Sequence, residues 1–133
     1  MIITAKAQGY SKALVETRGH AILCDQPTNN GGEDEGMTPT ELLVGALAAC
    51  GLYYAAQYLK ARNLPADSLE VSVEAEKAPA PARLGSFRIV VKTAALEERH
   101  HEPILRAVKS CVVHNTLTHA PTIEVQLETA QAS

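Results

Sequence analysis

Residues 38–63 read TPTELLVGALAACGLYYAAQYLKARN, and this stretch decides the fold. Thr38 is a good N-cap, Pro39 suits the first helical position, and Glu41 completes a Thr-x-x-Glu capping box. Basic side chains fall in the last turn, where they complement the helix dipole. We therefore predict one long helix over residues 38–63, called the central helix below.

Apolar side chains surround the central helix instead of forming one stripe, which is typical of a helix buried in a core or a membrane. A membrane span needs roughly 20 mainly apolar residues, whereas the uninterrupted part here, Leu42–Ala56, is shorter and is followed by Gln57. The loop before the helix is acidic and has no basic flank. We therefore expect a core helix and no membrane partner.

The composition places limits on the class of protein. The chain has 133 residues, a net charge of −3, one Phe and no Trp, which predicts a single domain over residues 1–133 and no nucleic-acid partner. The first residues, MIITAKAQGY, lack the pattern of a signal peptide, so we expect a cytoplasmic protein. Three cysteines in a reducing compartment indicate buried or reactive thiols rather than a disulfide framework.

The remaining elements are predicted from alternating apolar residues and from turn signals. The expected strands are a meander at Ile2–Ala7, Lys12–Thr17 and Ala21–Asp25, a pair at Ser68–Glu76 and Phe87–Thr93, and a last strand at Ile123–Glu128. Between the paired strands, Lys77–Gly85 is expected to be an exposed loop. A second helix is expected from Pro103, carrying Cys111, with a short helical turn to Leu117.

The predicted order is βββ-α-ββ-α-β, an α+β fold with one mostly antiparallel sheet. One such sheet covers only one side of a helix that is apolar all round. Two chains solve this problem, because each sheet then covers one side of a pair of central helices. We therefore predict an obligate homodimer with an interface above about 2,000 Å².

The three cysteines are the first candidates for chemistry. A single cysteine is most often a small buried hydrophobe, and Cys24 is assigned that role. Cys50 and Cys111 could instead form a pair, in which one attacks a substrate and the other resolves the product as a disulfide. Such a pair needs Cα atoms within about 7 Å, which spacing in the sequence does not establish.

The pattern GG-x-x-x-G-x-TPTELLVGALAAC, followed by SCVVHNTL, resembles the OsmC/Ohr superfamily of osmotically inducible and organic hydroperoxide resistance proteins. The resemblance covers nearly the whole chain. It implies an intertwined homodimer in which the antiparallel sheets of two chains wrap around two long central helices. It also implies a thiol peroxidase site at the dimer interface, where Cys50 reduces an organic hydroperoxide to form a sulfenic acid and Cys111 condenses with it.

The resemblance also implies an arginine that activates the reactive cysteine and a glutamate that orients the arginine, and here the match is weaker. The glutamate position falls on Thr40. Glu41 lies nine residues before Cys50, so on a straight helix the two point to opposite sides, about 13 Å apart along the axis. A capping role explains Glu41 more simply, although the partner's helix could bring it near. Arg18 is the only arginine before the helix, and its position in a turn suggests a solvated tip.

Histidines offer weaker candidates. His114 follows Cys111 by three residues and could act as a base or proton shuttle, but a histidine at a helix end that meets the dipole is the commoner case. His100 and His101 are adjacent and point apart, and no ligand spacing accompanies them, so we expect no metal. The segment Asn29–Gly32 opens no βαβ unit, so no phosphate cradle and no cofactor are expected.

Two functions follow as hypotheses. The first is a cysteine-dependent peroxidase that reduces organic hydroperoxides through Cys50 and Cys111 and is recycled by a thiol reductant. The second is a non-peroxidatic dimer that binds a small hydrophobic or thiol ligand at its interface, which Thr40 and the position of Arg18 favour.

Overall fold

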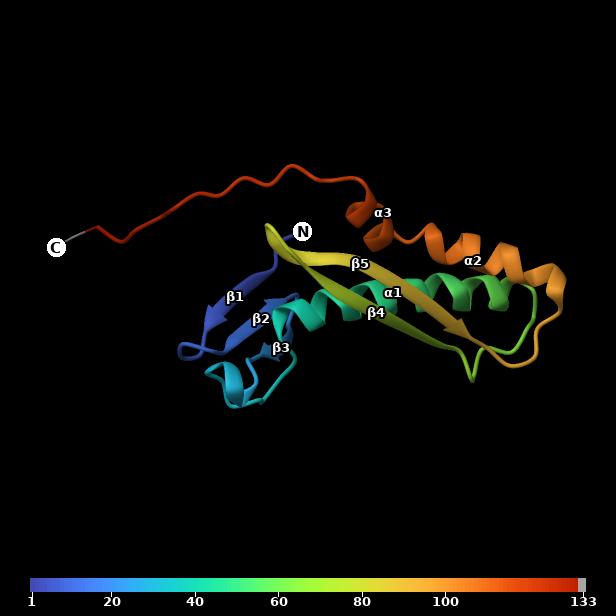
Figure 1. The fold of residues 1–133 in the computed structure, drawn as a ribbon, viewed down its shortest axis with the longest axis horizontal. Coiled ribbons are helices and arrows are strands. Elements are labelled where there is room, and N and C mark those ends of the chain that lie inside the picture. The colour runs from blue at the N-terminus through green and yellow to red at the C-terminus, as the bar shows by residue number, and fades with distance from the viewer. Residues whose placement is uncertain (132–133) are drawn as a thin grey trace.

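The computed structural model describes residues 1–131. Its elements are β1 (Thr4–Ala7), β2 (Ala13–Thr17), β3 (His20–Cys24), α1 (Pro39–Ala61), β4 (Glu70–Pro79), β5 (Ala82–Lys92), α2 (His101–Lys109) and α3 (Val112–Thr118). Short 3₁₀ turns lie at Thr28–Asn30 and Glu98–His100. Figure 1 shows α1 as the spine of the molecule, with the β4–β5 hairpin and α2 alongside it and the β1–β3 sheet near its amino-terminal end.

The central helix begins and ends as predicted. The Thr38 backbone N–H donates to Glu41 Oε1 at 2.9 Å, and the Glu41 N–H donates to Thr38 Oγ1 at 3.1 Å, which completes the capping box. At the other end Asn63 has a φ of +54°, and the Leu64 N–H donates to the Leu59 carbonyl at 2.9 Å. A left-handed residue followed by such a bond is a usual way to terminate a helix.

By length and composition α1 is a helix that could cross a membrane, as the core helix of a soluble protein also could. In this fold α1 packs against α2 and β4. A Cβ atom on Gly51 would lie 3.3 Å from Val108 Cγ1, so a small residue lets the two helices approach closely. These contacts support the reading of α1 as a core helix.

The strands form two separate antiparallel sheets, so the prediction of one sheet is wrong. The first sheet has the order β1-β2-β3, and the second is the β4–β5 hairpin. The central helix and its long acidic loop separate the two strand groups, and within one chain no hydrogen bonds join them. The β4–β5 sheet shows the predicted alternation: Phe87, Ile89 and Val91 are half-buried and Arg88 is exposed. Arg88 pairs across the strands with Glu74 at 2.6 Å.

The hairpin loop is much shorter than predicted. Residues 77–85 were expected to be an exposed loop, but β4 continues to Pro79 and β5 begins at Ala82. Lys77 pairs with Leu84 and Ala78 with Arg83, after a bulge at Glu76/Lys77. The two prolines lie at the end of β4 and in the turn itself, where the ladder does not need their missing N–H groups.

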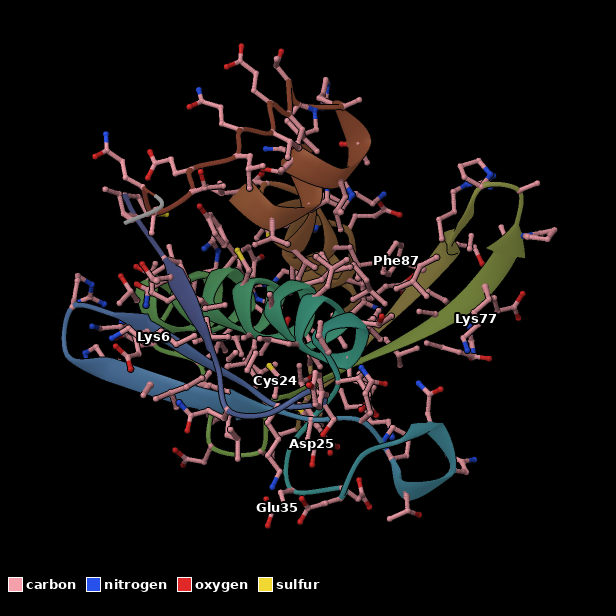
Figure 2. The ribbon with its side chains drawn as sticks, turned by 90° about the vertical axis from the view of Figure 1, so that its left-hand side faces the viewer. Lys6, Cys24, Asp25, Glu35, Lys77 and Phe87 are labelled. Atoms are coloured by element: carbon pink, nitrogen blue, oxygen red, sulfur yellow. The ribbon has the colours of Figure 1, made fainter. Side chains whose placement is uncertain are left out.

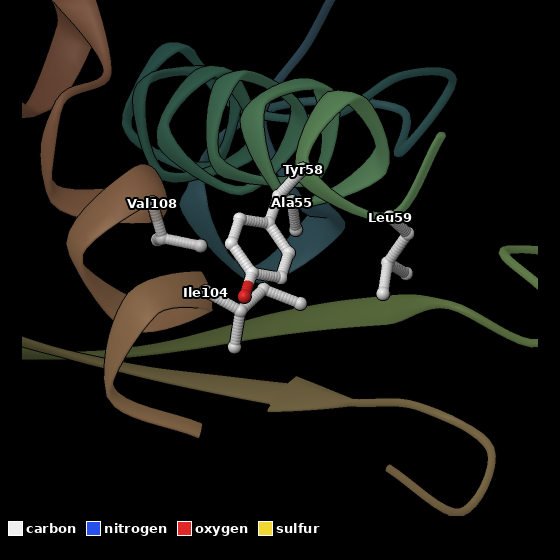
Figure 3. Close-up of a cluster of buried hydrophobic side chains, with 5 residues drawn as sticks. All are labelled: Ala55, Tyr58, Leu59, Ile104 and Val108. Carbon is white, nitrogen blue, oxygen red and sulfur yellow. The ribbon is translucent and has the colours of Figure 1, made fainter. Parts of the chain in front are cut away.

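The buried core lies in the carboxyl-terminal half of α1. Ala55, Tyr58 and Leu59 pack against Ile104 and Val108 of α2. Figure 3 shows these side chains filling the space enclosed by α1, α2 and the β4–β5 hairpin. The amino-terminal half of α1 is less covered: Leu47 is buried, but Leu43 is 42 % exposed.

The loop between β3 and α1 is organised by one buried carboxylate. Asp25 is 0 % exposed and accepts backbone N–H groups from Gln26, Glu33 and Glu35 at 2.7–3.1 Å. Figure 2 shows Asp25 next to Cys24 at the end of the sheet, with Glu35 on the loop that it holds. The Asp25 carboxylate therefore anchors the acidic loop at the end of the sheet.

The last predicted strand, Ile123–Glu128, is absent within this chain. Residues 120–131 have no regular structure, and Ile123, Val125 and Leu127 are 80 %, 91 % and 86 % exposed. In Figure 1 this segment extends away from the rest of the fold. A strand needs a neighbouring strand to bond with, and no sheet edge of the chain itself lies beside this segment.

Candidate functional site

Cys111 lies at a joint between two helices, not within the second helix as predicted. α2 ends at Lys109, and the Ser110 hydroxyl donates back to the Arg106 carbonyl at 3.0 Å. Cys111 then adopts extended backbone angles, φ −59° and ψ 135°, as the N-cap of α3. Its Sγ accepts the backbone N–H of His114 at 3.4 Å.

The structure brings Cys50 and Cys111 together from distant parts of the chain. Burial raises the pKa of the Cys111 thiol, and interaction with the Cys50 side chain raises it further, while the N–H groups of His114 and Val113 oppose this rise. Cys111 is fully buried and Cys50 is half-buried, and both are free thiols. Cys24 is also free, and it is buried on β3, as a structural residue would be.

A large open groove lies next to the cysteine pair. Its volume is about 1310 Å³, and it is bounded by the first half of α1, the β4–β5 hairpin, α2 and α3. Neither sulfur lines it directly, but Leu47, Val108 and His114 do, and each lies three residues from Cys50 or Cys111. The groove therefore starts one helical turn from the sulfurs.

The lining of the groove combines apolar and cationic side chains. Leu43, Leu47, Ile89 and Val91 are among its apolar members. The cations that border it are Lys77, Arg83, Arg88 and Lys109. The sequence does not assign these cations to a site, because a lysine or arginine on the outer face of a strand or helix is usually only exposed to solvent. Such a groove suits a ligand that is largely apolar.

The two predicted activating residues are not with the cysteines in this chain. Glu41 makes both bonds of the capping box, which agrees with its capping role. Arg18 is exposed in the β2–β3 turn with a φ of +50°, and it borders a separate surface pocket of about 500 Å³. Thr40, at the position where a glutamate was expected, lines the groove.

The histidines have different environments. His100 Nδ1 shares a hydrogen bond of 2.8 Å with Tyr58 Oη, and His101 Nε2 contacts the Leu96 carbonyl at 2.9 Å. His114 Nδ1 is buried and has no hydrogen-bond partner. Among residues 1–131 no group of His, Cys, Asp and Glu side chains could hold a metal ion.

Comparison with known proteins gives the same fold. A sequence model of the family described as OsmC-like protein matches residues 32–126. A Psychrobacter arcticus structure assigned to the osmotic stress and detoxification response has a TM-score of 0.78 at 20 % identity, covering 86 % of this chain and 85 % of that one. An OsmC-like protein of Mycoplasma pneumoniae has a TM-score of 0.74 at 23 % identity, with coverages of 90 % and 87 %.

A third structure shares the fold. The organic hydroperoxide resistance protein OhrB of Bacillus subtilis has a TM-score of 0.62 at 18 % identity, covering 90 % of this chain and 93 % of that one. No curated protein matches the chain in sequence. At these identities the shared feature is the fold, an α+β arrangement of small antiparallel sheets and helices.

Proposed function

Because this chain belongs to the OsmC-like family, we propose that it is a thiol-dependent peroxidase that reduces organic hydroperoxides through Cys50 and Cys111. The observation that carries the proposal is the proximity of these two side chains, close enough for Cys50 to raise the pKa of Cys111, beside a large, partly apolar groove. The groove has room for an organic substituent, and the half-buried Cys50 is the more accessible sulfur. We assign Cys50 the attack and Cys111 the resolution.

The chemistry has two steps and a recycling reaction. The Cys50 thiolate attacks one peroxide oxygen, the O–O bond breaks, and a sulfenic acid is formed, while the alkoxide that leaves takes up a proton from water and becomes an alcohol. The Cys111 sulfur then attacks the Cys50 sulfur, the S–O bond breaks, and a disulfide and water are formed. Two electrons from a dithiol reductant restore both thiols.

We also propose that the working unit is an intertwined homodimer of single-domain chains in the cytoplasm. The chain exposes 10270 Å² of surface, whereas a folded monomer of 14.2 kDa exposes about 6,800 Å². The excess of about 3,500 Å² per chain is at least the roughly 1,000–2,500 Å² that each partner of an obligate dimer buries. Tyr53 and Leu52 of α1 are 59 % and 38 % exposed, so two chains that bring their α1 helices together would cover this surface.

The test is a thiol count after addition of cumene hydroperoxide. In a Cys24→Ala background, one equivalent should remove both remaining thiols, and Cys50→Ser should abolish the reaction. Cys111→Ser should still lose the Cys50 thiol and yield a sulfenic acid that dimedone traps. Thiol counts that stay unchanged in the Cys24→Ala protein would reject the peroxidase.

The second candidate is a non-peroxidatic dimer that binds a small hydrophobic or thiol ligand. It is favoured by Thr40 at the position where a glutamate was expected and by the exposed position of Arg18. Native mass spectrometry of the purified protein should then reveal a bound small molecule, lost when Leu47→Arg fills the groove. A thiol that reacts with hydroperoxide at once would favour the peroxidase instead.

A further inference from the structure

His114 adjoins the cysteine pair through its backbone. Its backbone N–H donates to Cys111 Sγ at 3.4 Å, so the residue adjoins the sulfur directly. His114 also lines the groove, and its Nδ1 atom is buried without a hydrogen-bond partner. These observations place an unused proton-exchanging group on a residue that adjoins Cys111 and borders the groove.

The unpartnered nitrogen sets His114 apart from other histidines. His100, His101 and His119 each have a ring nitrogen within 2.8–3.1 Å of a partner. A buried polar atom without a partner costs about 1–3 kcal/mol, so a native protein that keeps one calls for an explanation. His114 Nδ1 is the only such buried side-chain atom within residues 1–131.

The direction of the side chain agrees with a role at Cys111. Side chains on an α-helix lean toward its amino terminus, over the turn that precedes them. His114 is the third residue of α3, and Cys111 is the residue just before that helix. The imidazole therefore leans toward the joint that carries the sulfur.

The resolving step needs a proton acceptor at this point. A thiol attacks only as its thiolate, and burial raises the pKa of Cys111, so its proton must be removed during the attack. The other ionisable groups that border the groove are Lys77, Arg83, Arg88 and Lys109, which are cations. Histidine is the side chain suited to accept and return a proton near neutral pH.

We propose that His114 transfers the proton in the resolving step. The imidazole takes the Cys111 proton as the Cys111 sulfur attacks the Cys50 sulfur, and it returns that proton to the hydroxide that leaves. One S–S bond forms, one S–O bond breaks, and water departs, with no electrons required beyond those already removed from Cys50. The physiological setting of this step rests on the proposed peroxidase function, but the proton transfer itself can be measured without any peroxide.

The experiment uses a mixed disulfide. In the Cys24→Ala protein, Ellman's reagent should modify the half-buried Cys50 and release one equivalent of thionitrobenzoate. Attack by Cys111 on the Cys50 sulfur should then release a second equivalent, whose rate reports the resolving step alone. Cys111→Ser should release only the first equivalent.

His114→Gln should leave the first phase unchanged and slow the second phase at pH 7 by about 100-fold, the low end of the usual contribution of a general base. The rate of the slowed phase should rise steadily with pH, and added imidazole should restore part of it. Glutamine suits the third position of a helix, so α3 should form, which circular dichroism checks. His114→Asn is the second variant, and the matched control is His119→Gln at the other end of α3.

Each outcome decides the proposal. A second phase in His114→Gln and His114→Asn that equals the control in rate and pH profile would overturn it. A slowed phase with the control's pH profile and no rescue by imidazole would show a structural role and would also overturn it. Absence of a second equivalent in the parent protein would overturn it together with the cysteine pair. If hydroperoxide leaves the thiols intact while the second phase depends on His114, the peroxidase fails and the proton-transfer role stands.

Discussion

Asp25 is a buried charged residue whose environment explains its ionisation. Burial opposes a charge on this carboxyl, yet the N–H groups of Glu35 and Gln26, the Ser11 hydroxyl and the N–H of Glu33 together hold its pKa at about 2. In a sequence, an aspartate at the start of an acidic loop is most simply read as solvated. The hydrogen bonds that contradict this reading come from residues brought near only by folding, so the sequence pattern did not reveal them.

Asp25→Ala should lower the melting temperature by about 5 °C or more, because it leaves three backbone N–H groups without their acceptor. The folded pKa lies below the unfolded value of about 3.9, so the carboxylate stabilises the fold above pH 4. This contribution is lost as the pH falls toward 2. The difference in melting temperature between the parent protein and Asp25→Ala should therefore become smaller below pH 4. Asp34→Asn, in the same loop at a φ of +55° that asparagine tolerates, is the control.

Tyr58 joins α1 to the turn before α2 through its hydroxyl. Tyr58→Phe removes the 2.8 Å bond to His100 but keeps the ring, over which the Arg62 guanidinium lies at 3.6 Å. We expect the free energy of unfolding in urea to fall by about 1 kcal/mol. Tyr53→Phe, on the exposed face of the same helix, should change it little. Equal losses in both variants would contradict a specific role for the bond.

At the scale of elements, the start of α1 is set by two side chains. Thr38→Ala removes the acceptor of the Glu41 N–H and should destabilise the protein by about 1 kcal/mol, measured by urea unfolding. Ser68→Ala, in an exposed turn, is the control. If the two variants unfold at the same urea concentration, the capping box contributes nothing measurable.

Elements with local signals were predicted well, and those that depend on distant partners were not. Thr38, Pro39 and Glu41 fix α1 within one turn of the chain, and the alternation of Val71 to Ala75 defines a strand without outside information. The predicted loop between β4 and β5 is too long, because proline and alanine are weak strand signals. The strands continue through this segment because their residues pair across the hairpin. Cys111 was placed inside a helix because nothing in its neighbours shows that the Ser110 hydroxyl turns back to Arg106.

The candidate site was predicted only in its cysteines. The sequence suggests Cys50 and Cys111 as a pair, and in the structure Cys50 lies close enough to raise the pKa of Cys111. The groove and its cations come from four separate elements, so no residue spacing in the sequence predicts that they lie together. The buried nitrogen of His114 likewise depends on packing, and the sequence favoured a plain helix-end role for that residue.

At the scale of the whole molecule, the unpaired surfaces predict association. In analytical ultracentrifugation at micromolar concentration, the protein should sediment as a particle of twice 14.2 kDa. Leu52→Glu, which places a charge on the exposed apolar side of α1, should weaken the dimer at least tenfold, whereas Lys60→Ala in the last turn should not. A parent protein that sediments as a well-folded monomer would contradict the proposed assembly.

The loop held by Asp25 has a consequence beyond its own stability. It connects β3 to α1, and the ion pairs of Lys12 with Glu33 and Glu35 also join it to the amino-terminal sheet. In the proposed dimer, the orientation of that sheet toward the second subunit would depend on the loop that the Asp25 carboxylate holds. A change that disorders this loop would therefore weaken dimerisation, although the loop lies outside the interface. The loss of dimer would be greater at lower protein concentration.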